Sequence, residues 1–210
     1  MPVPIVPVEV REMEPEDRRG NEAEQVTVLV LSHCILNRAT RWWKNGRPIE
    51  MNSGPVDRVL ELLSTRRIGA IQMPCPEFTF LGNPRPPATK DEYEALPGFQ
   101  RHCESLARDV AQGLKASDTL SRKPKIKILG IVGVKCSPSC SVECTPRRIG
   151  DSTRYVKEKG LFLEILEKEL ARLDLRVPFV EVDLDRPEGF CQSLDELLGS
   201  VDEKDGLFLR

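Results

Sequence analysis

The sequence lacks a run of about 20 apolar residues, the length that a membrane-spanning helix needs, so a membrane partner is not expected. Its first residues also lack the charged and apolar stretches of a secretory signal peptide, and we expect a cytoplasmic protein. A basic excess is absent too, because 31 lysines and arginines accompany 33 acidic residues and the net charge is -2. Such a chain has little means of binding a phosphate backbone by counterion release, so nucleic acid is not an expected partner.

Pairs of the form C-x2-C are absent as well, although the chain contains seven cysteines. Structural zinc sites usually take their ligands from such short pairs, so that kind of site is not expected. The C-x3-C-x3-C run at Cys136, Cys140 and Cys144 also differs from the C-x3-C-x2-C spacing of radical enzymes that use S-adenosylmethionine. An odd number of cysteines in a chain without a signal peptide argues against a disulfide framework and favours metal or thiol chemistry.

The length and composition are typical of one α/β domain. The chain has 210 residues, of which 40% are hydrophobic and 30% charged. Residues 1–25 combine proline with charge and show no sustained period, so we interpret them as an extended or mobile arm, or alternatively as an edge strand. Residues 26–210 are expected to form a single α/β domain.

Apolar runs and helical patterns alternate along that domain. Near-continuous aliphatic runs predict buried strands at Val26–Cys34, Ile68–Glu77, Lys125–Cys136 and Val177–Asp185. Helical spacing of apolar residues predicts helices at Pro55–Leu63, Cys103–Leu114, Phe162–Leu173 and near Ser193–Leu198. This alternation predicts a Rossmann-like parallel sheet of about four to five strands with helices on both faces. The proline-rich insert at Phe78–Pro97 is interpreted as a functional loop.

Three cysteines occupy equivalent places in this predicted topology. Cys34, Cys75 and Cys140 stand at or just beyond the ends of three predicted strands. Ligands of open α/β sheets bind in the crevice beyond the carboxyl ends of the strands, so the fold would gather these thiols at one edge. Three soft ligands suit zinc, copper(I) or an iron-sulfur cluster. A cluster held by three thiolates leaves one iron open as a Lewis acid.

Three sequence motifs resemble those of the thiouracil desulfidase (TudS-like) family. The matching stretches are SHCILN followed by Arg41 and Trp42, then CPEFTFLGNPRPPA, then CSPSCS, and together they extend from about Val26 to Cys140. The resemblance implies a [4Fe-4S] cluster held by the cysteines at positions 34, 75 and 140, with one iron free of protein ligands. It also implies a non-redox reaction in which a thiocarbonyl sulfur binds that iron and water replaces the sulfur.

The chain departs from the family pattern at several positions. Asn37 and Ser141 stand where the family has glycine, Trp42 where it has tyrosine, and a Phe-Thr-Phe-Leu stretch replaces the glycines that usually follow C-P-E. These changes alter the expected wall of the pocket. The resemblance therefore implies a related subgroup whose small thiolated substrate is another thiolated base, a thioamide or a thiocarbonyl metabolite.

Polar residues beside the cysteines are the candidates for catalysis. Glu77 is a candidate general base, because partial desolvation can raise a carboxyl pKa towards neutrality, and the alternative is a capping role or an ion pair with Arg85. Ser137 is a candidate donor to substrate or proton shuttle, and the alternative is a serine that only shapes the turn at Pro138.

Three further side chains are candidates for binding substrate. Arg85 could hold a substrate carbonyl or its own loop through its fork of donors, and the loop role is favoured. Arg41 and Trp42 could close the pocket, with the indole stacking on a planar ring, or they could pack at the surface.

The remaining cysteines and the histidines leave alternatives open. If Cys136 were a fourth ligand, the cluster would be closed and the protein would be an electron carrier or sensor. Otherwise Cys136 and Cys144 are bystanders, which is the favoured interpretation, or they carry sulfur as a persulfide. A third alternative is a metal-free cysteine hydrolase that uses Cys75. Cys103 and Cys191 are expected to pack in apolar surroundings. His33 is expected to point away from Cys34 as a packed or capping residue, and His102 is expected to be solvated.

Overall fold

The computed structural model describes residues 25–49 and 53–206, and the expected arm at 1–25 lies outside them apart from its last residue. Helices separate the four strands of the main sheet along the chain, as the sequence predicts. Four parallel strands form one sheet in the order β4-β1-β5-β8. They are β4 (Gly69–Gln72), β1 (Gln25–Leu31), β5 (Lys125–Val134) and β8 (Phe179–Val182). The predicted α/β fold with a parallel sheet is therefore confirmed.

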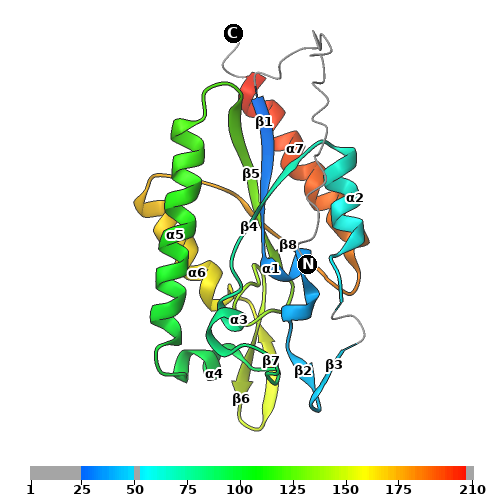
Figure 1. Ribbon diagram of the computed structural model, residues 1–210, viewed down its shortest axis with the longest axis vertical. Helices are drawn as coiled ribbons and strands as arrows, with labels where there is room; N and C mark the ends of the chain where they lie inside the picture. The colour runs from blue at the N-terminus through cyan, green and yellow to red at the C-terminus, as the bar shows by residue number, and fades with distance from the viewer. Residues whose placement is uncertain (1–24, 50–52, 207–210) are drawn as a thin grey trace, which may run out of the picture.

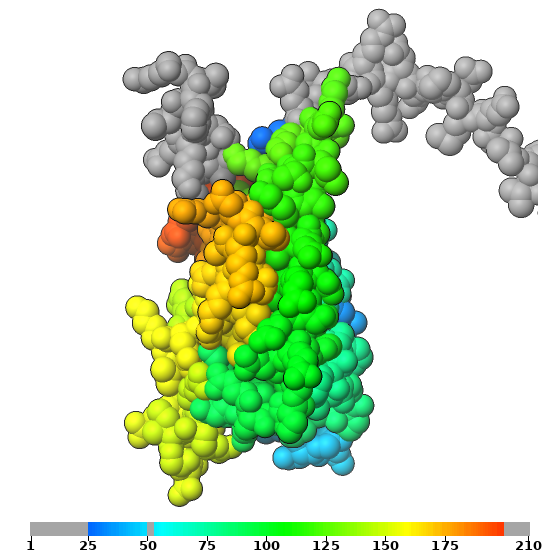
Figure 2. All heavy atoms as spheres, turned by 90° about the vertical axis from the view of Figure 1, so that its left-hand side faces the viewer, coloured from blue at the N-terminus to red at the C-terminus, as the bar shows by residue number. Residues whose placement is uncertain are grey.

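Helices cover both faces of this sheet (Figure 1). One face carries α5 (Phe99–Leu120) and α6 (Leu161–Arg172), and the other carries α2 (Asp57–Thr65) and α7 (Phe190–Gly206). Figure 2 shows α5 and α6 lying side by side along the molecule. No helix in the described part of the chain is long and apolar enough to cross a membrane.

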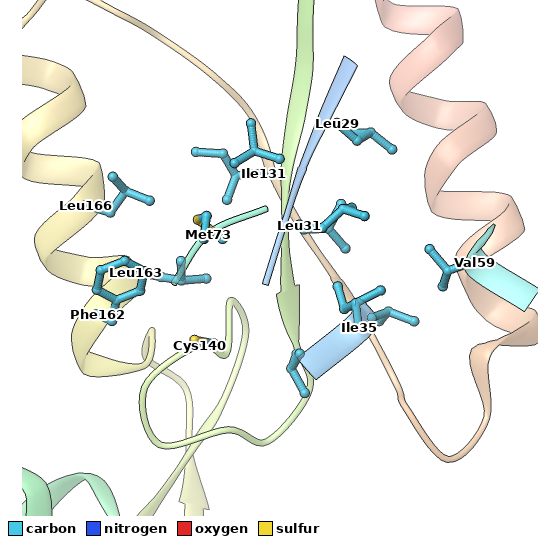
Figure 3. Packing of buried hydrophobic residues seen from close by; sticks show 14 of the residues in the cluster. Leu29, Leu31, Ile35, Val59, Met73, Ile131, Cys140, Phe162, Leu163 and Leu166 are labelled. Carbon is cyan, nitrogen blue, oxygen red and sulfur yellow. The ribbon is translucent and has the colours of Figure 1, made fainter. Parts of the chain in front are cut away.

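The core forms around β1, because this strand pairs with β4 on one side and β5 on the other. Leu29, Val30 and Leu31 have no exposed surface. Successive side chains of a strand point to opposite faces, so a strand covered on both faces is apolar throughout. Figure 3 shows the two layers that result, with Leu31 near Ile35 on one side of the sheet. On the other side, residues of β5 and α6 pack together: Ile131, Phe162, Leu163 and Leu166.

The strands end earlier than the sequence predicts. After β1 the chain turns at Ser32 into the short helix α1 (His33–Leu36), and β4 ends before the two prolines that flank Cys75. Proline supplies no donor to a strand ladder, which accounts for the end of β4. The cysteines therefore lie in the segments that follow the strands.

The insert at 78–97 is not a plain loop, which corrects the sequence interpretation. It contains most of α3 (Pro76–Leu81) and the whole of α4 (Lys90–Ala95). Cys75 caps α3 and Pro76 occupies its first turn, while Thr89 and Glu92 form a capping box at the start of α4. Such end signals stabilise short helices even where prolines break the sequence pattern.

Two small hairpins lie at the end of the molecule that also carries α3 and α4 (Figure 1). They are β2 (Trp43–Lys44) with β3 (Arg47–Pro48), and β6 (Thr145–Ile149) with β7 (Ser152–Val156). Lys90 is 1% exposed and its Nζ contacts Glu164 at 2.8 Å and the Lys159 carbonyl oxygen at 2.8 Å, which joins α4 to the start of α6. Arg147 of β6 forms ion pairs with Asp91 and Glu94 of α4. These contacts hold the β6–β7 hairpin against α4.

Two glycines allow the segment around Cys140 to pack closely. A Cβ atom on Gly133 of β5 would lie 2.8 Å from Val142 Cγ2 and would overlap the carbonyl oxygen of Cys140. A Cβ on Gly160, before α6, would lie 2.6 Å from the backbone nitrogen of Cys140. Backbone atoms cannot give way as a flexible side chain can, so both positions require a residue without a Cβ.

We predict that Gly133→Ala lowers the free energy of unfolding by about 1–3 kcal/mol, the usual cost of overpacking. Urea unfolding of the purified protein measures this loss. Gly113→Ala is the matched control, because no atom lies within 4 Å of its added Cβ. That change should stabilise the exposed helix position by about 0.4–1 kcal/mol. Equal unfolding midpoints for Gly133→Ala and the wild type would contradict the close approach.

Candidate functional site

Three cysteines line one cavity at the carboxyl ends of the strands. Cys34 lies in α1 after β1, Cys75 precedes α3 after β4, and Cys140 lies in the segment after β5. The cavity has a volume of about 80 Å³. Figure 3 shows Cys140 just beyond the ends of the strands, below the core. Every predicted site residue also contributes to the lining: Arg41, Trp42, Glu77, Arg85 and Ser137.

The three cysteines are mostly shielded from water. Cys75 is 7% exposed and Cys140 is 6% exposed, while Cys34 is partly exposed. Burial raises the pKa of Cys34 to about 11 and that of Cys75 to about 12. Burial also raises the pKa of Cys140, and the nearby thiols of Cys34 and Cys75 raise it further. Three adjacent thiolates would therefore need a cationic partner to stabilise them.

The same burial bears on metal-free cysteine chemistry. A thiol whose pKa is raised by apolar surroundings supplies little of the nucleophilic thiolate. Cys75 Sγ also accepts a hydrogen bond from the backbone N–H of Phe78 at 3.4 Å, so it acts as the cap of α3. This environment does not favour a hydrolase with Cys75 as its nucleophile.

Hydrogen bonds within the segment 137–141 hold Cys140 in place. Ser137 Oγ accepts from the backbone N–H of Cys140 at 3.0 Å and from that of Ser139 at 3.4 Å. The carbonyl oxygen of Cys140 accepts from the N–H of Val134 at 2.8 Å, which ties the segment to β5. Ser137 therefore shapes the turn, as one of the two sequence interpretations proposed, and its hydroxyl hydrogen can still be donated to another group.

Glu77 is the centre of a buried hydrogen-bond network. Its Oε2 accepts from Arg85 Nη2 at 3.1 Å and from Tyr93 Oη at 3.1 Å, and its Oε1 accepts from Ser139 Oγ at 2.5 Å. The side chains of Glu77 and Arg85 are 9% and 4% exposed, so the predicted ion pair is present and buried. Since Glu77 also lines the cavity, the ion pair and a role as proton acceptor are compatible.

Ser139 and Tyr93 are members of this network that the sequence analysis missed. Ser139 is 1% exposed and its Oγ lies 3.6 Å from Cys140 Sγ as well as close to Glu77. Its place in the S-P-S-C motif was a usable signal. Tyr93 is 2% exposed on α4 and stacks on Phe99 with ring centroids 4.6 Å apart. Nothing in the sequence around Tyr93 indicates that α4 brings its hydroxyl to Glu77.

A second cavity of about 410 Å³ shares lining residues with the first. Arg41, Trp42 and Glu77 contribute to both cavities. Arg41 Nη1 lies 3.8 Å from Asp185 Oδ1, and its side chain is 15% exposed. The β6–β7 hairpin supplies the far wall of this outer cavity through Arg148, Thr153 and Tyr155, among others. Arg41 and Trp42 thus lie where the inner cavity meets a larger space.

Comparison with known families gives a match over most of the chain. The family model described as "Putative 2-thiouracil desulfurase" matches residues 26–190. The chain belongs to this family. The match continues well beyond Cys140, so it includes α6 and β8 but only the first residue of α7.

Two individual proteins are similar to the chain. An uncharacterized protein of Methanocaldococcus jannaschii is 25% identical over 173 residues, which are 81% of this chain and 96% of that protein. Among solved structures, the [4Fe-4S]-dependent thiouracil desulfidase TudS is 18% identical, with a TM-score of 0.46, and the match covers 80% of this chain and 98% of that one.

No three His, Cys, Asp or Glu side chains within residues 25–49 and 53–199 converge in the way needed to hold a single metal ion. A cubane cluster has a different requirement, because each thiolate binds a different iron atom and the sulfurs stay apart. Cys34, Cys75 and Cys140 line one cavity without meeting at one point.

The other four cysteines fall into two classes. Cys103 is fully buried in α5 and packs in the core, as predicted, and Cys191 lies partly buried at the start of α7. Cys136 and Cys144 are partly exposed, and their Sγ atoms are 3.8 Å apart. Cys136 also lines both cavities.

His33 makes a packed contact, as predicted, although the reason given for its direction needs correction, and so does the prediction for His102. His33 belongs to α1 rather than to a strand, so strand alternation does not set its direction, and its Nδ1 contacts the Gln72 amide while burial lowers its pKa. His102 was expected to be solvated. Instead its Nε2 lies 2.7 Å from Thr79 Oγ1 and its ring centroid lies 5.3 Å from that of Phe80.

We predict that Arg85→Met destabilises the protein by about 3–5 kcal/mol, because it leaves the buried Glu77 carboxylate without its cation. Urea unfolding measures the loss. The double variant Glu77→Gln/Arg85→Met should lose less than Arg85→Met alone, since no uncompensated buried charge remains.

Arg58→Met serves as the control for that experiment, because Arg58 pairs with Glu61 on the surface. Exposed pairs contribute little to stability, so this variant should unfold close to the wild type. An Arg85→Met protein as stable as Arg58→Met would show that the Glu77–Arg85 pair is not buried in solution.

Proposed function

We propose that the chain is a [4Fe-4S]-dependent desulfidase that removes sulfur from a small thiocarbonyl compound without net redox change. The observation that carries this proposal is the single cavity lined by Cys34, Cys75 and Cys140 together with a buried carboxylate. Family membership supports the same reaction class. The substrate is expected to be a planar thiolated base or a related thioamide, in keeping with the family's description.

The donor set fits an iron-sulfur cluster. Three soft sulfur ligands come from three separate segments and line one cavity. Cys34, Cys75 and Cys140 would hold the cluster. When bound, a cluster with one iron free of protein ligands supplies a Lewis acid for the substrate's sulfur.

Glu77 is the group proposed to accept the proton of the attacking water. Arg85 and Tyr93 hold one carboxylate oxygen, so the orientation of the other is set before any substrate binds. The second oxygen contacts Ser139 Oγ and lies on the side of Cys140. The Arg85 guanidinium pairs with this carboxylate, which is the proposed proton acceptor.

The remaining lining residues are proposed to bind and orient the substrate. Ser137 accepts two backbone N–H groups and keeps its hydroxyl hydrogen for a donor role, either to the substrate or in moving a proton. Trp42 offers a flat surface for stacking at the boundary of the two cavities, and Arg41 beside it can donate to a substrate carbonyl. The outer cavity is proposed to let a substrate ring reach the inner cavity with its sulfur atom first.

Iron binding tests the ligand assignment. Protein purified without oxygen should contain iron and acid-labile sulfide, and Cys34→Ser, Cys75→Ser and Cys140→Ser should each lose them. Cys191→Ser is the matched control, because Cys191 is partly exposed on α7 and lies outside the cavity lining. Wild-type protein that binds no iron, or that holds one zinc per chain, would refute the cluster.

The catalytic role of Glu77 is tested separately from cluster binding. Glu77→Gln should keep its iron and lower the rate of sulfide release by about 10²–10⁴-fold, the usual contribution of general base catalysis. Sulfide is measured after incubation with 2-thiouracil, other thiolated bases and a thioamide. Retention of full activity by an iron-loaded Glu77→Gln protein would assign Glu77 to a structural role only.

The alternative of a closed, four-cysteine cluster in an electron carrier has its own test. A cluster with an open iron should change its absorption spectrum when a thiolated base is added to the loaded protein. A spectrum that stays constant, combined with loss of the cluster in Cys136→Ser, would favour the electron-transfer or sensor function instead.

A further inference from the structure

Cys136 and Cys144 lie beside the inner cavity but outside the set of proposed cluster ligands. Their Sγ atoms are 3.8 Å apart, and both residues are partly exposed. Cys103, by contrast, is sealed in the core with no exposed surface. The pair is therefore close enough for two thiols to react with each other, and it is reachable by small molecules.

The backbone holds this pair in place from several sides. Cys136 adopts a left-handed conformation with φ of 58°, at the turn that follows β5. Thr145 Oγ1 donates to the carbonyl oxygen of Ser137 at 3.2 Å, which joins the residue after Cys144 to the residue after Cys136. The two cysteines consequently flank the turn that carries Cys140, and their proximity follows from the same contacts.

The two thiols differ in what they face. Cys136 contributes to the lining of both cavities, whereas Cys144 contributes to neither. A nucleophile inside the cavity would reach Cys136 first, with Cys144 behind it. Cys136 is therefore the sulfur of the pair that a nucleophile in the cavity attacks, and Cys144 is the leaving sulfur.

We propose that Cys136 and Cys144 form a redox pair whose disulfide accepts sulfide from the cavity as a persulfide on Cys136. The inference rests on the proposed function, since desulfidation is what releases sulfide into the inner cavity. It adds a sulfur-carrying site to the hydrolytic one and uses residues that the desulfidation itself does not need.

The chemistry balances in two steps. First, a low-molecular-weight disulfide such as oxidised glutathione takes two electrons and two protons from the two thiols, which forms the Cys136–Cys144 bond. Hydrosulfide then attacks Sγ of Cys136, the bond to Cys144 breaks, and Cys144 leaves as a thiolate that takes a proton from water. The hydrosulfide sulfur is oxidised by the protein disulfide and stays on Cys136 as –S–SH.

The ionisation of the pair decides how the first step is carried out. Burial and the hydrogen bond to Cys144 raise the pKa of Cys136 to about 11. The Cys136 thiol is therefore largely protonated at neutral pH, and disulfide formation through its thiolate should become faster as the pH rises towards that value. Once formed, the disulfide has no proton to lose, so the second step proceeds at neutral pH.

The experiment uses the full-length protein and supplies sulfide directly. Protein is oxidised with oxidised glutathione at alkaline pH, freed of excess reagent, treated with sodium sulfide at neutral pH and alkylated. Peptide mass spectrometry then locates each modification. We expect loss of two hydrogens across Cys136 and Cys144 after oxidation and one added sulfur on Cys136 after sulfide.

Cys136→Ser and Cys144→Ser should both lose the persulfide, whereas Cys191→Ser should retain it at the wild-type level. Mapping of the wild-type protein gives the answer even if one variant folds poorly. A disulfide that does not form between these two residues, or added sulfur found on Cys144 or elsewhere, would overturn the proposal.

The use of sodium sulfide separates this inference from the proposed function. A persulfide on Cys136 supports the acceptor site even if no thiolated compound is turned over. Conversely, a chain that releases sulfide from a thiolated base but leaves Cys136 unmodified after sodium sulfide has the proposed function without the acceptor site.

Discussion

The buried ion pair between Glu77 and Arg85 is the interaction on which the site depends. A carboxylate and a guanidinium that are both shielded from water attract each other strongly, and each is costly to leave alone. Tyr93 and Ser139 complete the hydrogen bonds to the carboxylate. One side chain thereby ties together the segment after β4, the proline-rich insert, α4 and the segment that carries Cys140.

A second constraint acts on the Cys140 segment from the side of the core. The first N–H groups of a helix have no partner within the helix, and here the carbonyl oxygens of Pro138 and Ser139 accept from the N–H groups of Leu161, Phe162 and Leu163. The start of α6 therefore stabilises the cysteine segment, and Gly133 and Gly160 allow the close contact. The position of Cys140 and the stability of α6 depend on the same backbone atoms.

Much of the fold and part of the site follow from sequence patterns with a simple physical basis. Continuous aliphatic runs indicate strands covered on both faces, and residues after parallel strands meet at one edge, which is why Cys34, Cys75 and Cys140 could be placed together. The ends of helices and strands were harder to predict from the sequence. The helices within 78–97 depend on local caps among prolines, and Tyr93 reaches Glu77 only because α4 lies where it does.

The sequence by itself determined the alternation of strands and helices, the cysteine positions and the motifs of the desulfurase family, because these depend on local composition and order along the chain. Only the tertiary structure decided which polar groups meet. It paired Glu77 with Arg85, brought Ser139 and Tyr93 to the same carboxylate, and placed Cys136 against Cys144 at the cavity. Such contacts join segments that are far apart in the sequence or depend on the direction of a single side chain. The periodicity of residues along a chain carries no information about the approach of distant segments or about side-chain directions.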